Sequence, residues 1–160
     1  MPTPFRDEFI EFIDGSDTLH CGTRAINCHD WSQLFGVGDS RGGNRIIPGT
    51  PGRLARNHVR DELYAELGFR INGGWDEESA PVTSAQRTNC LELLDKVRSF
   101  LDGADGRQLQ VRLTTEDGTH TEACTFQAMG RVTFPTAHIA EFTVMIAVPA
   151  GIMPLPGASS

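Results

Sequence analysis

The sequence predicts a mainly β fold (α+β), a β-sandwich or partly closed barrel with one flanking α-helix at about residues 83–102. Several segments alternate apolar and polar residues, which is the period-two pattern of a half-buried strand. A single segment of about 18 residues has apolar residues at helical spacing, and a helix of that length is marginal alone, so it must pack across a sheet. Gly, Pro, Asp and Asn separate these segments, as turns require.

Short strands make up the first third of the chain. Residues 8–13 favour a strand that ends at a turn over residues 14–17. One or two short strands follow between residues 18 and 28, and residues 29–35 form a helical turn or an irregular link. The apolar anchors of that link are Trp31, Leu34 and Phe35.

The clearest strand spans residues 62–72 and is followed by the predicted helix. Every second residue of this strand is apolar, so one face is buried and the other is wet or covered by a partner. Residues 83–86 fit a capping box, in which Ser or Thr precedes Gln by three residues. The expected apolar stripe of the helix is Cys90, Leu91, Leu94, Val97 and Leu101. Gly103 is the expected C-cap.

The last third of the chain reads as a β-meander. Alternating residues around Val111 lead to a predicted hairpin tip at residues 116–119. After the return strand, a turn near Gly130 or a break at Pro135 leads to a strand over residues 137–148. That strand becomes apolar on both faces, which indicates a central strand or one covered by a neighbouring subunit.

An extended arm at about residues 36–60 interrupts these strands within what we take as a single domain, residues 1–160. Its Gly and Pro residues disfavour helix and sheet, and a compact domain seldom keeps so long a loop without a function. We therefore expect the arm to lie against a neighbouring subunit. The residues assigned to this assembly interface are Arg41, Asn44, Arg45, Ile46, Ile47, Pro48, Arg53 and Arg56.

The arginines of the arm suit a desolvated interface, because the guanidinium fork pairs bidentately with carboxylates. The carboxylates expected to receive them on a neighbouring copy are Asp61, Glu62, Asp76, Glu77 and Glu78. Two alternatives for the arm are a disordered basic loop and a phosphate-binding loop whose glycines expose backbone donors.

The formal charge of −7 argues against sequence-independent DNA binding, which needs clustered Lys and Arg. No apolar run approaches the ~20 residues that span a bilayer, and the N-terminus does not have the pattern of a signal peptide. The scattered cysteines are expected to be reduced, in a protein made in a cytoplasm. They are Cys21, Cys28, Cys90 and Cys124.

Three groups of residues could carry chemistry. A zinc site is conceivable at His20, Cys21, Cys28 and His29, but adjacent residues of a strand point to opposite faces, which favours two buried cysteines and two surface histidines. Cys124, with His120 or His138, would make a nucleophile only if its thiol were exposed. The acidic run at residues 76–78 could hold a cation, although such runs usually mark a solvated loop. We predict no catalytic residue, no metal and no cofactor.

The arm sequence from Arg41 to Gly52 precedes an alternating strand ending in Gly, one capped helix, a β-hairpin and a last strand ending at Pro149. This layout resembles the tail proteins of long-tailed bacteriophages, the tail-tube and distal-tail superfamily, and especially the major tail proteins of phages with actinobacterial hosts. The resemblance covers roughly residues 8–152, and its most specific part is the arm.

This resemblance implies a structural virion protein rather than an enzyme, with hexameric rings stacked into the tail tube that conducts DNA during ejection. The alternative is a distal tail (baseplate hub) ring that connects the tube to the tail tip. The implied partners are further copies of the chain, a tape measure protein, and a tail terminator or tail-tip hub; DNA passes without specific binding, and no membrane is involved. The implied location is the virion tail, after synthesis in the host cytoplasm. A metal-binding or carbohydrate-binding module is a weaker alternative.

Overall fold

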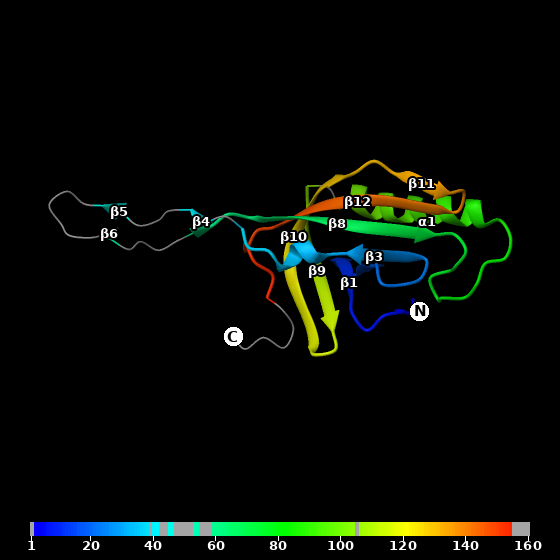
Figure 1. Cartoon of the computed structure of the whole chain (residues 1–160), viewed down its shortest axis with the longest axis horizontal. Helices are drawn as coiled ribbons and strands as arrows, with labels where there is room; N and C mark the ends of the chain where they lie inside the picture. The colour runs from blue at the N-terminus through cyan, green and yellow to red at the C-terminus, as the bar shows by residue number, and fades with distance from the viewer. Residues whose placement is uncertain are drawn as a thin grey trace.

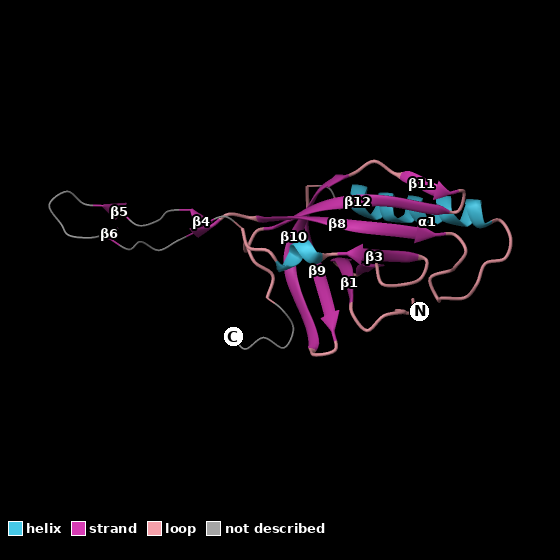
Figure 2. Ribbon diagram, in the orientation of Figure 1, coloured by secondary structure: helices cyan, strands magenta, loops and turns pink. Residues whose placement is uncertain are grey.

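The computed structural model describes residues 2–38, 61–104 and 106–154, together with the backbone of four two-residue strands between residues 40 and 60. One antiparallel sheet dominates the described residues (Figures 1 and 2). Its strands are β1 (Phe9–Asp14), β2 (Asp17–His20), β3 (Ile26–Asp30), β8 (Leu63–Asn72), β9 (Gln108–Thr115), β10 (Gly118–Met129), β11 (Thr133–Thr136) and β12 (Ile139–Val148). The strand order is β2-β1-β9-β10-β12-β8-β3, with β11 paired to β12.

The sheet curls so that its two edge strands meet through a short connection. Gly22, two residues after the end of β2, forms an isolated antiparallel bridge with Asn27 of β3, and the Cys28 amide donates to the Cys21 carbonyl at 2.6 Å. The ring of Phe12 in β1 stacks with that of Phe69 in β8 at a centroid distance of 6.4 Å. Strands that are distant in the sheet order therefore face each other across one core. The predicted mainly β fold with a flanking helix is confirmed, in the form of an open, curled antiparallel sheet.

The two long central strands match their predictions. Along β8, buried residues alternate with more exposed ones at every position, as the sequence pattern requires. The β12 strand pairs with β8 over its whole length and with β10 over its second half, so it is central. Its buried run at the C-terminal end is explained by neighbours within the same chain.

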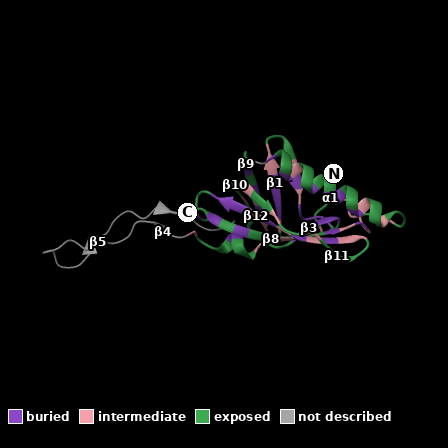
Figure 3. Cartoon of the chain, turned by 90° about the horizontal axis from the view of Figure 1, so that it is seen from above, coloured by how far each residue is buried: buried purple, intermediate pink, exposed green. Residues whose placement is uncertain are grey.

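The helix α1 (Gln86–Gly103) packs its apolar side into the same core, and Figure 3 shows both buried and exposed positions along it. The predicted capping box is wrong, because Ala85 at the N-cap has a left-handed φ of 54° and no side chain caps the helix. Leu91 is also wrong as a core residue: it is 43% exposed, whereas Leu93 is buried. The helix includes Gly103, and the cap is the buried Ala104.

The turns decide where the smaller elements begin and end. The hairpin tip is confirmed, because β9 ends at Thr115 and β10 begins at its pairing partner Gly118. A 3₁₀ helix, η1 (Ser32–Phe35), takes the place of the predicted link, with Leu34 buried. The sequence reading missed β11, since Pro135 indicates a break. An edge strand with a register irregularity tolerates that proline, because the ladder needs no donor from it.

The backbone of the arm is more regular than the sequence predicts. β4 (Ser40–Arg41) pairs antiparallel with β7 (Val59–Arg60), and β5 (Arg45–Ile46) pairs antiparallel with β6 (Arg53–Leu54). Both pairs are separate from the main sheet. This antiparallel pairing gives hydrogen-bond partners to part of the backbone of these eight residues. No helix in the described part of the chain has the length and apolarity that crossing a membrane requires.

Candidate interaction surface

The eight side chains predicted for the assembly interface lie outside the described residues. They are Arg41, Asn44, Arg45, Ile46, Ile47, Pro48, Arg53 and Arg56. What the structure describes is the part of the domain from which the arm departs and the surface next to it.

Three segments hold the root of the arm in place. The Gly38 amide donates to the Gly151 carbonyl at 2.6 Å, and Val37 bridges Ile152. A Cβ atom on Gly38 would lie 2.1 Å from the Asp61 carbonyl oxygen, so only glycine fits where the two ends of the arm come together. The arm therefore leaves the domain from a fixed base.

Exposed apolar side chains border this base. Val37 is 49% exposed, Ile152 is 40% exposed, and Tyr64, the second residue of β8, is 57% exposed. We call these three residues the arm-root surface. They are three of the six large hydrophobic side chains that are exposed among the described residues.

A cavity of about 540 Å³ lies beside η1, between the N-terminal segment and the β9–β10 hairpin tip. We call it the acidic cavity. Its lining combines four carboxylates and two aromatic rings with one guanidinium and one imidazole: Asp7, Glu8, Asp30, Glu116, Trp31, Phe35, Arg6 and His29. The two rings meet edge to face at a centroid distance of 5.3 Å, and Phe35 is 52% exposed.

The carboxylates of the acidic cavity differ in their bonding. Asp30 Oδ1 accepts hydrogen bonds from the Ser32 hydroxyl at 2.8 Å and the Ser32 amide at 3.2 Å, and these bonds lower the pKa of the Asp30 carboxyl. Asp7, Glu8 and Glu116 form no ion pair with any cation of the described residues. Four carboxylates against the single arginine, Arg6, leave the described lining with an excess of negative charge.

The charge of the chain is divided unevenly between arm and domain. Residues 40–60 contain five arginines and no acidic residue. The rest of the chain holds the other 9 of the 14 basic residues and all 21 acidic ones. The arm is thus a basic segment attached to an acidic domain, and the two are electrostatically complementary.

Several of the carboxylates predicted to receive the arm already have contacts within the chain. Glu77 Oε2 pairs with Lys96 Nζ at 2.5 Å, and Asp76 Oδ1 accepts the amides of Glu78 and Ala80. Glu62 interacts with Tyr64 by its charge and a hydrogen bond, which raises the pKa of the Tyr64 hydroxyl. Asp61 and Glu78 also have contacts within the chain. These five carboxylates are therefore less available to a partner than Asp7, Glu8 and Glu116 of the acidic cavity.

The four residues of the conceivable zinc site face different surroundings. Cys21 and Cys28 are buried, His29 is exposed, and Nδ1 of His20 contacts Glu11 Oε2. Burial raises the pKa of both thiols, so neither is a ready thiolate ligand. The described residues contain no group of three or more His, Cys, Asp or Glu side chains arranged to hold a metal ion.

The conceivable nucleophile is also a core residue. Cys124 is fully buried, and burial raises the pKa of its thiol to about 12. The ring of His120 interacts with Glu122 at 3.2 Å. A protonated thiol on the core face of β10 has the properties of a packing residue.

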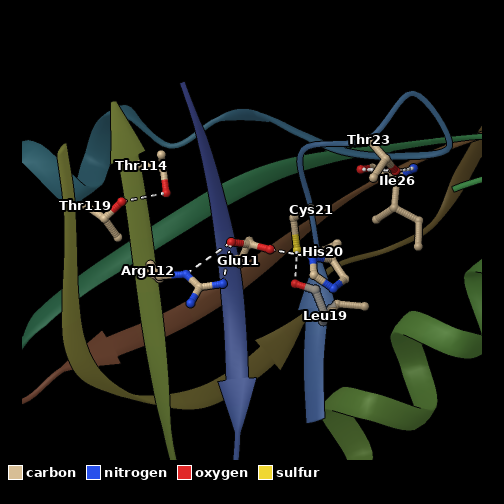
Figure 4. Close-up of polar contacts among 9 residues, drawn as sticks. All are labelled: Glu11, Leu19, His20, Cys21, Thr23, Ile26, Arg112, Thr114 and Thr119. Carbon is tan, nitrogen blue, oxygen red and sulfur yellow. Dashed lines mark hydrogen bonds and ion pairs between the residues drawn. The ribbon is translucent and has the colours of Figure 1, made fainter. Parts of the chain in front are cut away.

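A buried polar cluster on the outer face of the sheet was not foreseen from the sequence (Figure 4). Glu11 in β1 is only 7% exposed, and its Oε1 accepts bonds from Arg112 Nε at 3.1 Å and Nη2 at 2.6 Å. Its other oxygen contacts His20. Strand register brings these residues together, because Glu11 lies opposite His20 on one side and Arg112 on the other. Only knowledge of the pairing order β2-β1-β9 could have revealed the cluster.

No protein-family model matches the chain, and no curated protein matches it. Among solved structures, the chain is similar to the SPP1 Dit (gp 19.1) protein, described as a paradigm of the hub adsorption apparatus in Gram-positive infecting phages. The sequence identity is 10% and the TM-score 0.45, over 89% of this chain and 50% of that chain. The chain thus spans about half the length of SPP1 Dit, and at this score the likeness carries no argument about function.

Proposed function

We propose that the chain is a structural subunit of a bacteriophage tail, not an enzyme, and that it assembles with copies of itself into a hexameric ring. The observation that carries this proposal is the opposite charge of the arm and the acidic cavity within one chain. The layout of arm, alternating strand, helix and hairpin, which resembles tail proteins, supplies the tail context.

In the proposed ring, the arm of one subunit reaches the acidic cavity of the next. A segment of 21 residues that doubles back as a hairpin can extend roughly 30 Å, which is enough to cross onto a neighbour. Arginine forks would pair with Glu8 and Glu116 and stack on Trp31 or Phe35, whose faces favour cations. The arm-root surface would be buried where the arm leaves its own subunit.

The stacked tail tube is our first assignment for this ring, and the distal tail ring is the alternative. Gene order distinguishes them. A very long helical, tape-measure-like reading frame downstream supports the tube, whereas the same frame immediately upstream supports the distal ring.

Charge reversal tests the contact between arm and cavity. Arg45→Glu with Arg53→Glu should abolish the ring, and Glu8→Lys with Glu116→Lys should do the same; combining all four changes should restore it. Native mass spectrometry measures the assembly. A matched control, Glu92→Lys with Asp95→Lys on the exposed face of α1, makes the same change in net charge away from the cavity and should leave the ring intact.

Removing the arm separates assembly from folding. Replacing residues 41–53 by a short Gly/Ser linker should leave thermal melting nearly unchanged, because the cost of closing a loop depends weakly on its length. The same change should abolish rings and tubes in electron micrographs. Arg45→Ala with Arg53→Ala should weaken assembly more at low salt than at high salt, where the pairs are already screened. Normal rings from the arm-replaced protein, or only monomers of the unaltered protein at high concentration, would contradict the proposal.

A further inference from the structure

Two cysteines face each other at the point where the two edges of the sheet are joined. Gly22 bridges Asn27 in an antiparallel arrangement. Cys21 precedes Gly22 and Cys28 follows Asn27, so the two cysteines are opposite each other. The Cys28 amide donates to the Cys21 carbonyl at 2.6 Å, which confirms this register. Both residues are free thiols in this structure.

The geometry of such a pair suits a disulfide. Opposite residues of a hydrogen-bonded antiparallel pair have Cα atoms ~5.5 Å apart, and disulfides join Cα atoms ~4.4–6.8 Å apart. Opposite residues also direct their side chains to the same face of the sheet, and here both side chains enter the core, Cys21 at 0% and Cys28 at 3% exposure. Burial raises the pKa of the Cys21 thiol, and the neighbouring Cys28 raises it further.

We propose that Cys21 and Cys28 form an intramolecular disulfide when the chain folds in the presence of a small-molecule disulfide such as oxidised glutathione. The Sγ–H bonds of both cysteines are lost and one Sγ–Sγ bond forms. The two electrons and two protons pass to oxidised glutathione, which becomes two molecules of the thiol. The bond would fasten the connection between β2 and β3, independently of any assembly of subunits.

Burial determines when this oxidation occurs. In the folded, reduced chain the thiols are protonated and shielded, so an added oxidant reacts slowly. In the unfolded chain both thiols are open to the oxidant, and the short connection of residues 22–27 keeps them near each other. Once formed, the buried disulfide is shielded from reductants in the same way.

The experiment refolds the denatured, reduced chain in a glutathione redox buffer and then alkylates the remaining thiols. Two of the four cysteines, Cys90 and Cys124, should remain alkylatable after unfolding. Trypsin cuts after Arg24, so the disulfide should link the peptides 7–24 and 25–41 in a non-reduced map. The oxidised protein should melt about 5 °C higher than the reduced one, from the loop-closure effect of a short loop.

Two variants act as controls on the assignment. Cys90→Ser with Cys124→Ser should keep the link between peptides 7–24 and 25–41, whereas Cys28→Ser should lose it and leave Cys21 alkylatable. Four alkylatable cysteines after refolding with oxidised glutathione, or a link that includes Cys90 or Cys124, would overturn the proposal. The peptide map of the unaltered chain decides the question even if a variant fails to fold.

Discussion

Two ion pairs with the same geometry but different burial allow a direct test of how this fold uses charge. In both pairs one carboxylate oxygen accepts hydrogen bonds from the arginine Nε at 3.1 Å and from its Nη2 at 2.6 Å. The pairs are Arg112 with Glu11 and Arg70 with Glu141. The side chain of Glu11 is 9% exposed and that of Glu141 is 34% exposed. Solvent exposure is therefore the main difference between them.

A double-mutant cycle measures the coupling free energy of each pair, with Gln replacing the carboxylate, the arginine, or both. Hydrogen bonds to charged groups contribute about 1.5–3 kcal/mol to stability when they are little exposed. Because the side chain of Arg112 is 33% exposed, we expect a coupling free energy of about 2 kcal/mol for Glu11–Arg112. For Glu141–Arg70 we expect about 0.5 kcal/mol, as is usual for exposed pairs.

Urea unfolding followed by circular dichroism gives the free energies of unfolding. Glu11→Gln should cost more than Arg112→Gln, because Glu11 also contacts His20. In 1 M salt, where the Debye length is about 3 Å, the exposed coupling should vanish while most of the buried one remains. Equal couplings for the two pairs, or loss of both in high salt, would refute the view that burial sets their strength.

Three further predictions concern the core and the helix. Phe69→Ala should lower the free energy of unfolding by about 3–5 kcal/mol, because the ring stacks with two other phenylalanines; urea unfolding measures this loss. Leu93→Ser should lower the free energy of unfolding by at least about 2 kcal/mol, and Leu91→Ser by less than about 0.5 kcal/mol. Equal losses for the two variants in urea unfolding would show that Leu91 is a core residue after all. Burial raises the pKa of Cys124 from 9.0 to about 12, so its contribution to stability is complete below pH 9 and falls as the pH rises towards 12. Urea midpoints measured from pH 8 to 11 should decline, and by less in Cys124→Ala.

Local patterns in the sequence were enough to find most of the elements. The alternation in β8, the hairpin tip before Gly118 and the helical spacing around Val97 depend only on neighbouring residues, and the structure confirms all three. The errors occurred where a pattern was ambiguous. The capping box lacked the backbone conformation it needs, because Ala85 is left-handed, and Pro135 concealed an edge strand.

The sequence by itself determined the class of fold and the presence of a basic arm, because both follow from the order of residues along the chain. Only the tertiary structure decided which distant residues meet. The curl of the sheet places Phe12 against Phe69, strand register sets Glu11 between His20 and Arg112, and the N-terminal segment joins the hairpin tip to form the acidic cavity. These contacts depend on strand pairing across long separations, and one local pattern of alternation is compatible with many pairing orders.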